Sequence, residues 1–134
     1  MRTFILLVAF CIGSVGLVRA GQDLAAGQSI IRAQEQAFGR DDAVAAYAFA
    51  APSIKSWYRT PEAFMYMVRN GYAPVYRHQR FEFGAATVVD GKVLQQVHII
   101  DADGVAWEAV YTLEPQGDGS LKISACTLKK LVTA

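Results

Sequence analysis

The sequence predicts an α+β domain in which about three N-terminal helices pack in the concave face of a curled, four-stranded antiparallel meander. Residues 81–128 contain four runs of alternating apolar and polar residues, which is the period of half-buried strands. Asp-Gly breaks separate these runs, and such pairs favour tight hairpin turns. Residues 23–71 instead show helical spacing of apolar residues. Helices followed by a run of strands are typical of the α+β class.

The chain begins with a segment typical of a secretory signal peptide. Arg2 precedes an apolar run over residues 4–18, and Ala20 ends the segment with a small residue. We therefore predict a signal peptide over residues 1–20 and one domain over residues 21–134, located in the periplasm or secreted. We expect no membrane association after cleavage. The alternative is a retained membrane anchor, although the apolar run is short and interrupted by glycines.

Composition narrows the range of functions. Lys and Arg total 13 against 12 Asp and Glu, with no basic stripe, so we expect no nucleic-acid partner. Of the two cysteines, only Cys126 lies beyond the predicted signal peptide, so the mature domain can form no internal disulfide. We interpret Cys126 as a small packed residue rather than a reactive thiol, because no His or Asp lies near it in sequence.

Two helices are predicted at the start of the domain. Leu24, Ile31 and Phe38 recur at a helical interval, which predicts a long amphipathic helix over residues 23–40. A shorter apolar stripe over residues 44–51 predicts the second helix, which begins after two capping aspartates and ends at a proline.

A third helix is predicted from residue 61. Thr60 supplies a capping hydroxyl, Pro61 suits the first helical position, and Glu62 places an acid in the first turn. The apolar stripe over residues 64–68 gives this helix a buried side, and Gly71 ends it.

The hairpin loops decide which strand residues face the helices. Two-residue loops would turn Gln96 and His98 toward Trp107. Three-residue loops with Gly in the left-handed position are preferred, because they collect a large apolar set on one face. That set is Phe81, Phe83, Val97, Ile99, Trp107, Ala109, Tyr111 and Leu113, joined by Leu121, Ile123 and Ala125. The opposite face then holds Glu82, Gln96, His98, Glu108, Thr112, Lys122 and Ser124.

Several short motifs together resemble a known family. They are Thr60-Pro61-Glu62-Ala63-Phe64, Gly71-Tyr72-Ala73-Pro74-Val75-Tyr76-Arg77, Asp101-Ala102-Asp103-Gly104 with Trp107, Tyr111-Thr112-Leu113-Glu114, and Ile123-Ser124-Ala125-Cys126. The chain is similar, over about residues 28–128, to the exported bacterial proteins known as domain of unknown function 4864. Its order of elements also resembles the cone-shaped nuclear transport factor 2-like superfamily. The resemblance implies a sheet wrapped around the long helix, with ligands held between them, and implies no particular reaction.

Five residues are candidates for binding a ligand. Trp107 and Tyr111 carry polar tips on large apolar bodies and are predicted to face the helices, where they either fill the core or hold a ligand. Tyr72, Tyr76 and Arg77 precede the first strand and are predicted to line the mouth of the cone. There Arg77 would meet an anionic head group. The alternative for these three is a solvated loop that covers helix ends.

The sequence shows no pattern that commits the chain to catalysis. His98 is the best candidate for a general base, but the preferred register places it outside the cone. Asp101 and Asp103 sit in a turn where Asp supports the backbone. No spacing of ligands fits a metal site, and we expect no metal and no cofactor.

Three functions remain open from sequence alone. The leading one is a non-catalytic module that binds a small amphipathic or anionic ligand or an interaction partner. The second is a small isomerase, dehydratase or hydrolase that uses the cone cavity, which an ionisable side chain inside the cone would favour. The third is a domain that forms homodimers through its sheet, because Leu94, Ile100 and Val110 interrupt the polar outer face.

Overall fold

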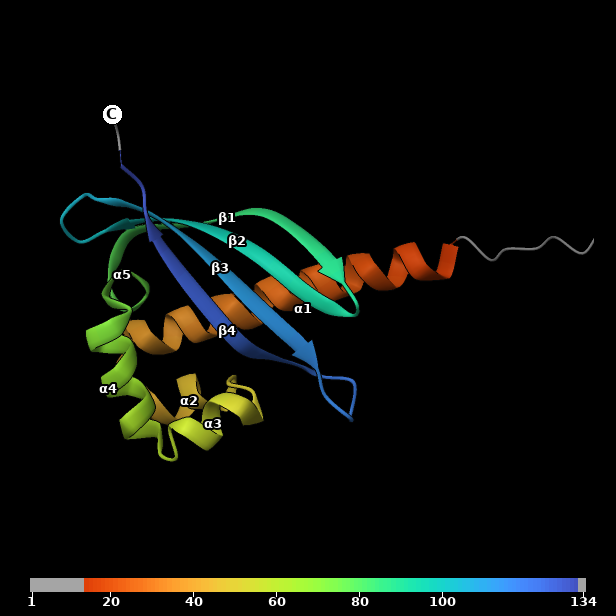
Figure 1. The fold of residues 1–134 in the computed structure, drawn as a ribbon, viewed down its shortest axis with the longest axis horizontal. Coiled ribbons are helices and arrows are strands. Elements are labelled where there is room, and N and C mark those ends of the chain that lie inside the picture. Colours follow the sequence, from red (N-terminus) through yellow and green to blue (C-terminus); the bar gives the residue numbers. More distant parts are fainter. Residues whose placement is uncertain (1–13, 133–134) are drawn as a thin grey trace, which may run out of the picture.

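The computed structural model describes residues 14–132, and it confirms the predicted α+β class (Figure 1). The signal-peptide prediction concerns residues 1–20, of which 1–13 lie outside the described residues. The described elements are α1 (Ser14–Gly39), α2 (Ala43–Ala48), α3 (Pro52–Trp57), α4 (Pro61–Gly71), α5 (Ala73–Tyr76), β1 (His78–Val89), β2 (Lys92–Asp101), β3 (Ala106–Pro115) and β4 (Leu121–Lys130). Among the described residues, no helix combines the length and apolarity needed to cross a bilayer.

The predicted helix starts are present, and two short helices are additional. The Asp42 side chain accepts a hydrogen bond from the Ala45 N–H at 3.1 Å, and the Thr60 hydroxyl accepts one from the Ala63 N–H at 3.0 Å. The sequence did not predict α3 and α5. Each has a proline in its first turn, where the missing N–H costs nothing. Helix α2 ends at Ala48, earlier than the predicted residue 51, and Pro52 starts α3 instead of ending α2.

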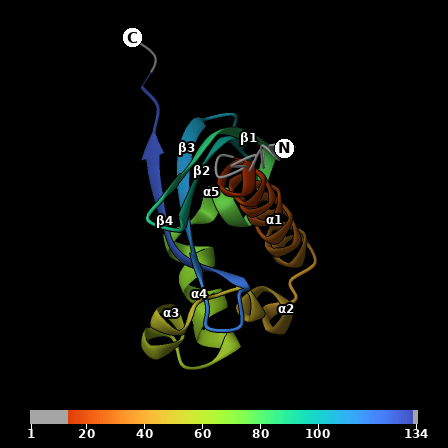
Figure 2. The same ribbon diagram turned by 90° about the vertical axis from the view of Figure 1, so that its right-hand side faces the viewer.

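The strands form one open sheet in the order β1-β2-β3-β4, all antiparallel. Helix α1 runs along one face of this sheet, and the four shorter helices gather at one end of α1 (Figures 1 and 2). Buried apolar residues fill the space between the sheet and the helices. They include Ile31, Phe38, Phe64, Val68, Val93, Val97, Ile99, Tyr111, Leu113 and Ile123.

The inner face of β1, β2 and β3 carries the predicted residues, although the first hairpin reaches that register in another way. Its loop has two residues, since Val89 pairs with Lys92, and both Asp90 (φ 51°) and Gly91 (φ 77°) are left-handed. A bulge between Phe83 and Ala86 adds one residue to β1 and corrects the resulting slip. Phe81 and Phe83 therefore still face Ile99 and Val97. The second loop has the predicted three residues and ends on left-handed Gly104 (φ 85°).

A fully buried amide supports this bulge. The Gln95 side chain donates to the Gly84 carbonyl at 3.1 Å and to the Gln96 carbonyl at 2.7 Å. Its own carbonyl accepts a hydrogen bond from the Gln28 side chain of α1 at 3.2 Å. Gln95 is 0% exposed, so these contacts replace the water that its amide and the bulge carbonyls would otherwise bind.

A second bulge, in β4, corrects one sequence prediction. Leu113 pairs with Ile123, whereas Thr112 pairs with Ala125, so Ser124 is the extra residue. Leu121 and Ile123 face inward as predicted, but Ala125 is exposed and does not. The bulge reverses the alternation after it, so Cys126 and Leu128 join the inner face instead.

Trp107 is less buried than predicted. Leu113 is 0% exposed, as expected for a residue beneath α1, but Trp107 is only partly buried. Its indole N–H donates to the Asp101 carboxylate at 2.9 Å across the second hairpin. The same carboxylate accepts the backbone N–H groups of Asp103 and Val105, so Asp101 has the predicted turn-supporting role.

The predicted polar face is the outer one. His98 is exposed there, and its ring occupies the space above Gly84, where an added Cβ would lie 2.6 Å from His98 Nε2. His98 therefore does not face the helices, as the preferred register predicted.

Candidate functional site: an apolar pocket beside β4

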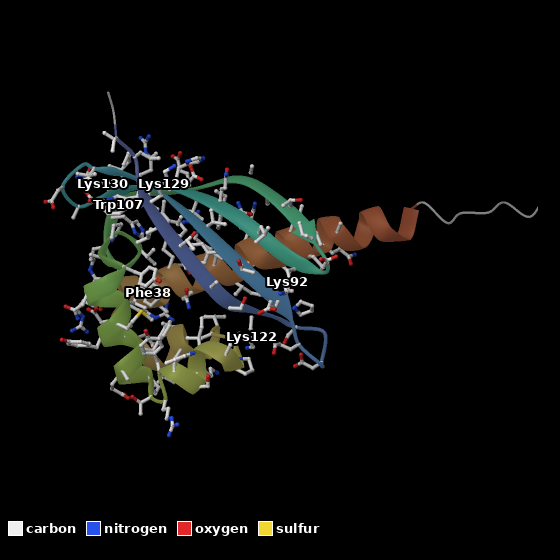
Figure 3. All side chains as sticks on the ribbon, in the orientation of Figure 1. Phe38, Lys92, Trp107, Lys122, Lys129 and Lys130 are labelled. Carbon is white, nitrogen blue, oxygen red and sulfur yellow. The ribbon has the colours of Figure 1, made fainter. Side chains whose placement is uncertain are left out.

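A pocket of about 220 Å³, open on one side, lies between the β4 edge and the helices. Phe38 forms part of its wall, and Figure 3 shows this ring between the sheet and the short helices. The lining comes from α1, α3, α4, α5, β3, β4 and the residues that follow α3 and α4. It comprises Gln34, Phe38, Ile54, Tyr58, Phe64, Met67, Val68, Tyr72, Val75, Tyr111, Ile123, Ser124, Ala125 and Cys126.

Burial distinguishes the floor of the pocket from its rim. Buried side chains form the floor, and most are apolar: Gln34, Phe38, Phe64, Val68, Val75, Tyr111 and Ile123. Partly exposed or exposed residues form the rim: Ile54, Tyr58, Met67, Tyr72, Ser124, Ala125 and Cys126. The side-chain nitrogen of Gln34 is occupied, since it donates to the Ala46 carbonyl at 3.1 Å. The pocket therefore presents aromatic and aliphatic surface with a few hydroxyl groups.

Tyr111 on the floor and Cys126 on the rim are neighbouring ionisable groups of the pocket. Burial raises the pKa of the Cys126 thiol to about 12, although the hydrogen bond from Tyr111 acts in the opposite direction. Burial also raises the pKa of the Tyr111 hydroxyl well above its usual value, and Cys126 adds to the increase. Burial likewise raises the pKa of Tyr72. All three groups are therefore uncharged at neutral pH.

The raised pKa of Cys126 predicts a loss of stability at alkaline pH. From about pH 9, the ordinary pKa of a thiol, to about pH 12, the unfolded chain releases the thiol proton while the folded chain keeps it, so the free energy of unfolding falls as pH rises. Tyr111 adds to this only above pH 10, the ordinary value for a phenol. Urea unfolding at pH 8, 9 and 10 should show the decline, and Cys126→Ala should flatten it. An equal decline in both proteins would contradict this role for Cys126.

The structure places two of the five predicted site residues at the pocket. Tyr72 lies on the rim and Tyr111 on the floor. Tyr76, Arg77 and Trp107 are outside the lining. The five residues therefore do not form one site.

Tyr76 and Arg77 instead stabilise the end of α1. The Arg77 guanidinium donates to the Phe38 carbonyl and to the Asp41 carboxylate, each at 2.8 Å, and the Tyr76 hydroxyl donates to the same carboxylate. The Tyr76 and Arg77 contacts hold the pKa of Asp41 below its usual value. The Phe38 carbonyl also accepts the Asp41 N–H at 3.1 Å, so Arg77 adds a second, charged donor at the C-terminal end of α1.

Sequence reasoning missed most of the pocket. Gln34 and Phe38 lie on the predicted long helix, but nothing local indicates that this part of the helix borders a cavity. Ile54 and Tyr58 belong to the unpredicted α3 region. Cys126 was expected on the last strand, and only the β4 bulge turns it inward. The tyrosines near α4 and α5 were the one sequence feature that indicated a binding site in this region.

A separate polar network lies between α1 and β1. Glu35 contacts His78 Nε2 at 2.7 Å and accepts from Arg32 at 2.6 Å. His78 Nδ1 lies 2.9 Å from the Pro74 carbonyl, which can only accept, so this nitrogen donates. Both ring nitrogens are thus occupied by protein groups, so we assign the network a structural role. Within residues 14–132, no group of His, Cys, Asp and Glu is arranged to hold a metal ion.

One comparison with known proteins gives a match. The family model described as domain of unknown function (DUF4864) matches residues 20–133. The chain belongs to this family. No curated protein and no solved structure matches it. The family description assigns no activity, so a function has to be inferred from the site itself.

Proposed function

We propose that this DUF4864 domain binds a small, largely apolar ligand in the pocket beside β4, without chemical turnover. The observation that carries the proposal is the lining, which is apolar and aromatic and has no carboxylate, imidazole, ammonium or guanidinium group. Its titratable groups are phenols and one thiol, and burial raises the pKa of Tyr72, Tyr111 and Cys126. Such a lining favours binding over acid-base catalysis, which needs a group that titrates near the working pH.

The size of the pocket limits the ligand. At about 220 Å³ it exceeds the ~150 Å³ void that binds benzene in other proteins. It is smaller than most sites for drug-sized molecules, which occupy roughly 300–1,000 Å³. A single aromatic ring or a short alkyl chain fits this range. The ligand can be amphipathic if its polar end remains at the open side, among the hydroxyl groups of Tyr58, Tyr72 and Ser124.

An anionic head group receives less support from the geometry. Arg77, the residue expected to bind it, already donates to Asp41 and to the end of α1. A carboxylate inside the pocket would lose its hydration without gaining an opposite charge. We therefore expect the neutral member of each matched ligand pair to bind at least as tightly as the anion.

Titration calorimetry with matched pairs tests the proposal. Hexanol with hexanoate and benzyl alcohol with benzoate differ mainly in charge, and the neutral members should bind with dissociation constants of about 10 µM to 1 mM. Cys126→Leu adds bulk to the rim and should weaken binding at least about tenfold, because it fills the space that the ligand needs.

Thr127→Leu is the matched control, since Thr127 is exposed and points to the opposite face of the same strand. It should leave affinity within about twofold. The absence of binding to the unmutated protein would refute the proposal and favour the sheet-mediated homodimer, which sedimentation velocity would then detect.

We further propose that the protein acts outside the cytoplasm, on the strength of Arg2, the apolar run and Ala20. Expression of the full-length chain in a bacterial host should yield a soluble periplasmic protein that begins at Gly21. Intact mass of the recovered protein is the measurement. A mass that includes residues 1–20 would rule out cleavage at this position.

A further inference from the structure

Strand β4 is an edge strand, and within residues 14–132 its C-terminal half has no neighbour on one side. The sheet order leaves only β3 paired along its length. Figure 2 shows β4 at the margin of the sheet, with no described element beyond its upper part.

The N-terminal half of the same edge is already covered. The Ile123 N–H donates to the Phe49 carbonyl at 2.9 Å, and the Ile123 carbonyl accepts from the Ala51 N–H at 2.7 Å. Residues 49–51 thus act as a short parallel strand. Pro52 then starts α3, and the chain leaves the edge. This edge can therefore accept an additional extended segment.

Backbone groups beyond this contact point outward. The Leu131 N–H donates to the Ala106 carbonyl of β3 at 3.0 Å. Because residues of an antiparallel ladder alternate in direction, Cys126, Leu128 and Lys130 direct their N–H and C=O groups away from β3. No described element pairs with this stretch, which is a template for another strand.

The pocket lies beside this template. On an added strand, the residue opposite Cys126 would point to the same face of the sheet as Cys126. That face carries the floor residue Tyr111, and the rim residues Tyr58 and Met67 border the same space. A large apolar side chain at this position would therefore enter the pocket.

Positive charge marks the end of the edge. Lys129 and Lys130 are both exposed; Glu108 of β3 lies opposite Lys129, but neither lysine belongs to an ion pair within residues 14–132. Figure 3 shows both lysines at the C-terminal end of β4, near Trp107. On an added strand, the residue opposite Lys129 would point to the outer face, three positions from the one opposite Cys126. An acidic residue there would meet Lys129.

We propose that residues 126–130 of β4 bind an extended peptide of a partner protein as an additional strand. One aromatic or large aliphatic side chain of the peptide fills the pocket, and an acidic side chain three positions away contacts Lys129. This inference rests on the proposed function and names its ligand: the apolar group that enters the pocket is carried by a peptide.

A second copy of this chain fits the edge less well. Antiparallel pairing of two β4 edges would bring four lysines, Lys129 and Lys130 from each copy, into one short ribbon. Like charges on neighbouring strands oppose pairing, and lysine at an edge is a common protection against self-association. An acidic partner would instead be attracted by Lys129 and Lys130.

Calorimetry with short capped threonine-rich peptides tests the inference. Each peptide carries one Phe and one Asp three positions apart, in either order. Replacing its Phe by Ala should weaken binding about tenfold or more, through loss of the pocket contact. The better peptide is also made in two N-methylated forms that carry the methyl groups on alternate sets of residues. In one form the methyl groups face β4, and in the other they face away from it. One should lose about tenfold or more in affinity because its methyl groups face β4, and the other should bind nearly as the parent.

Charge reversal tests the contact with Lys129. Lys129→Glu should weaken the Asp peptide by about two- to fivefold and strengthen a peptide with Lys in place of Asp. Lys92→Glu is the control for net charge: it breaks the Lys92–Glu114 ion pair at the opposite end of the sheet and should change the affinity for neither peptide.

The outcomes separate the two proposals. If the small neutral ligands bind but both methylated forms bind equally, or no peptide binds, the peptide inference is overturned and the pocket proposal stands. If neither ligands nor peptides bind, both fail. Concentration-dependent dimerisation that Lys129→Glu changes, without peptide binding, would assign the edge to a second copy instead.

Discussion

Phe38→Ala is expected to lower the free energy of unfolding by about 3–5 kcal/mol. Phe38 is 1% exposed, and its ring packs against those of Phe64 and Tyr76, with centroids 6.2 and 5.8 Å apart. It joins the last turn of α1 to α4 and α5 and forms part of the pocket floor. Truncation leaves a cavity that these helices can only partly close. Urea unfolding monitored by circular dichroism gives the change.

A surface residue of the neighbouring helix provides the control. Val44 on α2 is 68% exposed, so Val44→Ala should change stability by less than about 0.5 kcal/mol. A loss below about 1 kcal/mol for Phe38→Ala would show that the short helices are not anchored through this ring. The Phe38 ring would then not be a fixed part of the pocket floor.

Gln95→Leu is expected to cost about 2–4 kcal/mol, even though Leu is apolar and of similar size. The substitution removes the donor to the Gly84 and Gln96 carbonyls and leaves the Gln28 amide of α1 without its acceptor. The first hairpin would lose its support at the bulge that sets its register. Hydrogen exchange should accordingly rise in β1 before it rises in β3.

Its sequence neighbour offers a matched comparison. Gln96 is partly exposed on the outer face, and its side chain donates to Glu108 at 3.3 Å. Gln96→Leu should cost less than about 1 kcal/mol, because water can replace that contact. Equal losses in the two variants would show that burial of the Gln95 amide is not what stabilises the bulge.

Local sequence patterns determined the longer helices, the four strands and most of the strand residues that face the helices. Period-two alternation identified the inner face from Phe81 to Leu113 and placed His98 outside. Capping residues located the starts of α2 and α4. These features follow from dihedral preferences and side-chain direction within a few residues, so one chain without a structure suffices to read them. The family assignment over residues 20–133 agrees with the motifs quoted from the sequence.

The local sequence patterns did not predict the bulges in β1 and β4. The sequence predicts one register for each loop length. A two-residue first loop by itself would have moved the inner side chains of β1 to the outer face. The extra residue in β1 cancels this slip, and its place depends on Gln95 reaching it from the neighbouring strand. In β4 the extra residue Ser124 exchanges Ala125 for Cys126 on the inner face. Both corrections arise from contacts between strands, which local preferences do not contain.

The pocket and the free edge are decided by tertiary structure alone. Arg77 was expected at a ligand, but Asp41, which is 36 positions away in sequence, binds its guanidinium. Cys126, Tyr58 and Phe38 meet at one cavity only because α3 and α4 pack beside β4. A cavity is the volume that side chains from several elements leave unfilled, and an edge is a strand that no other element covers. Neither is a property of any one segment, so each exists only once all the segments are packed together.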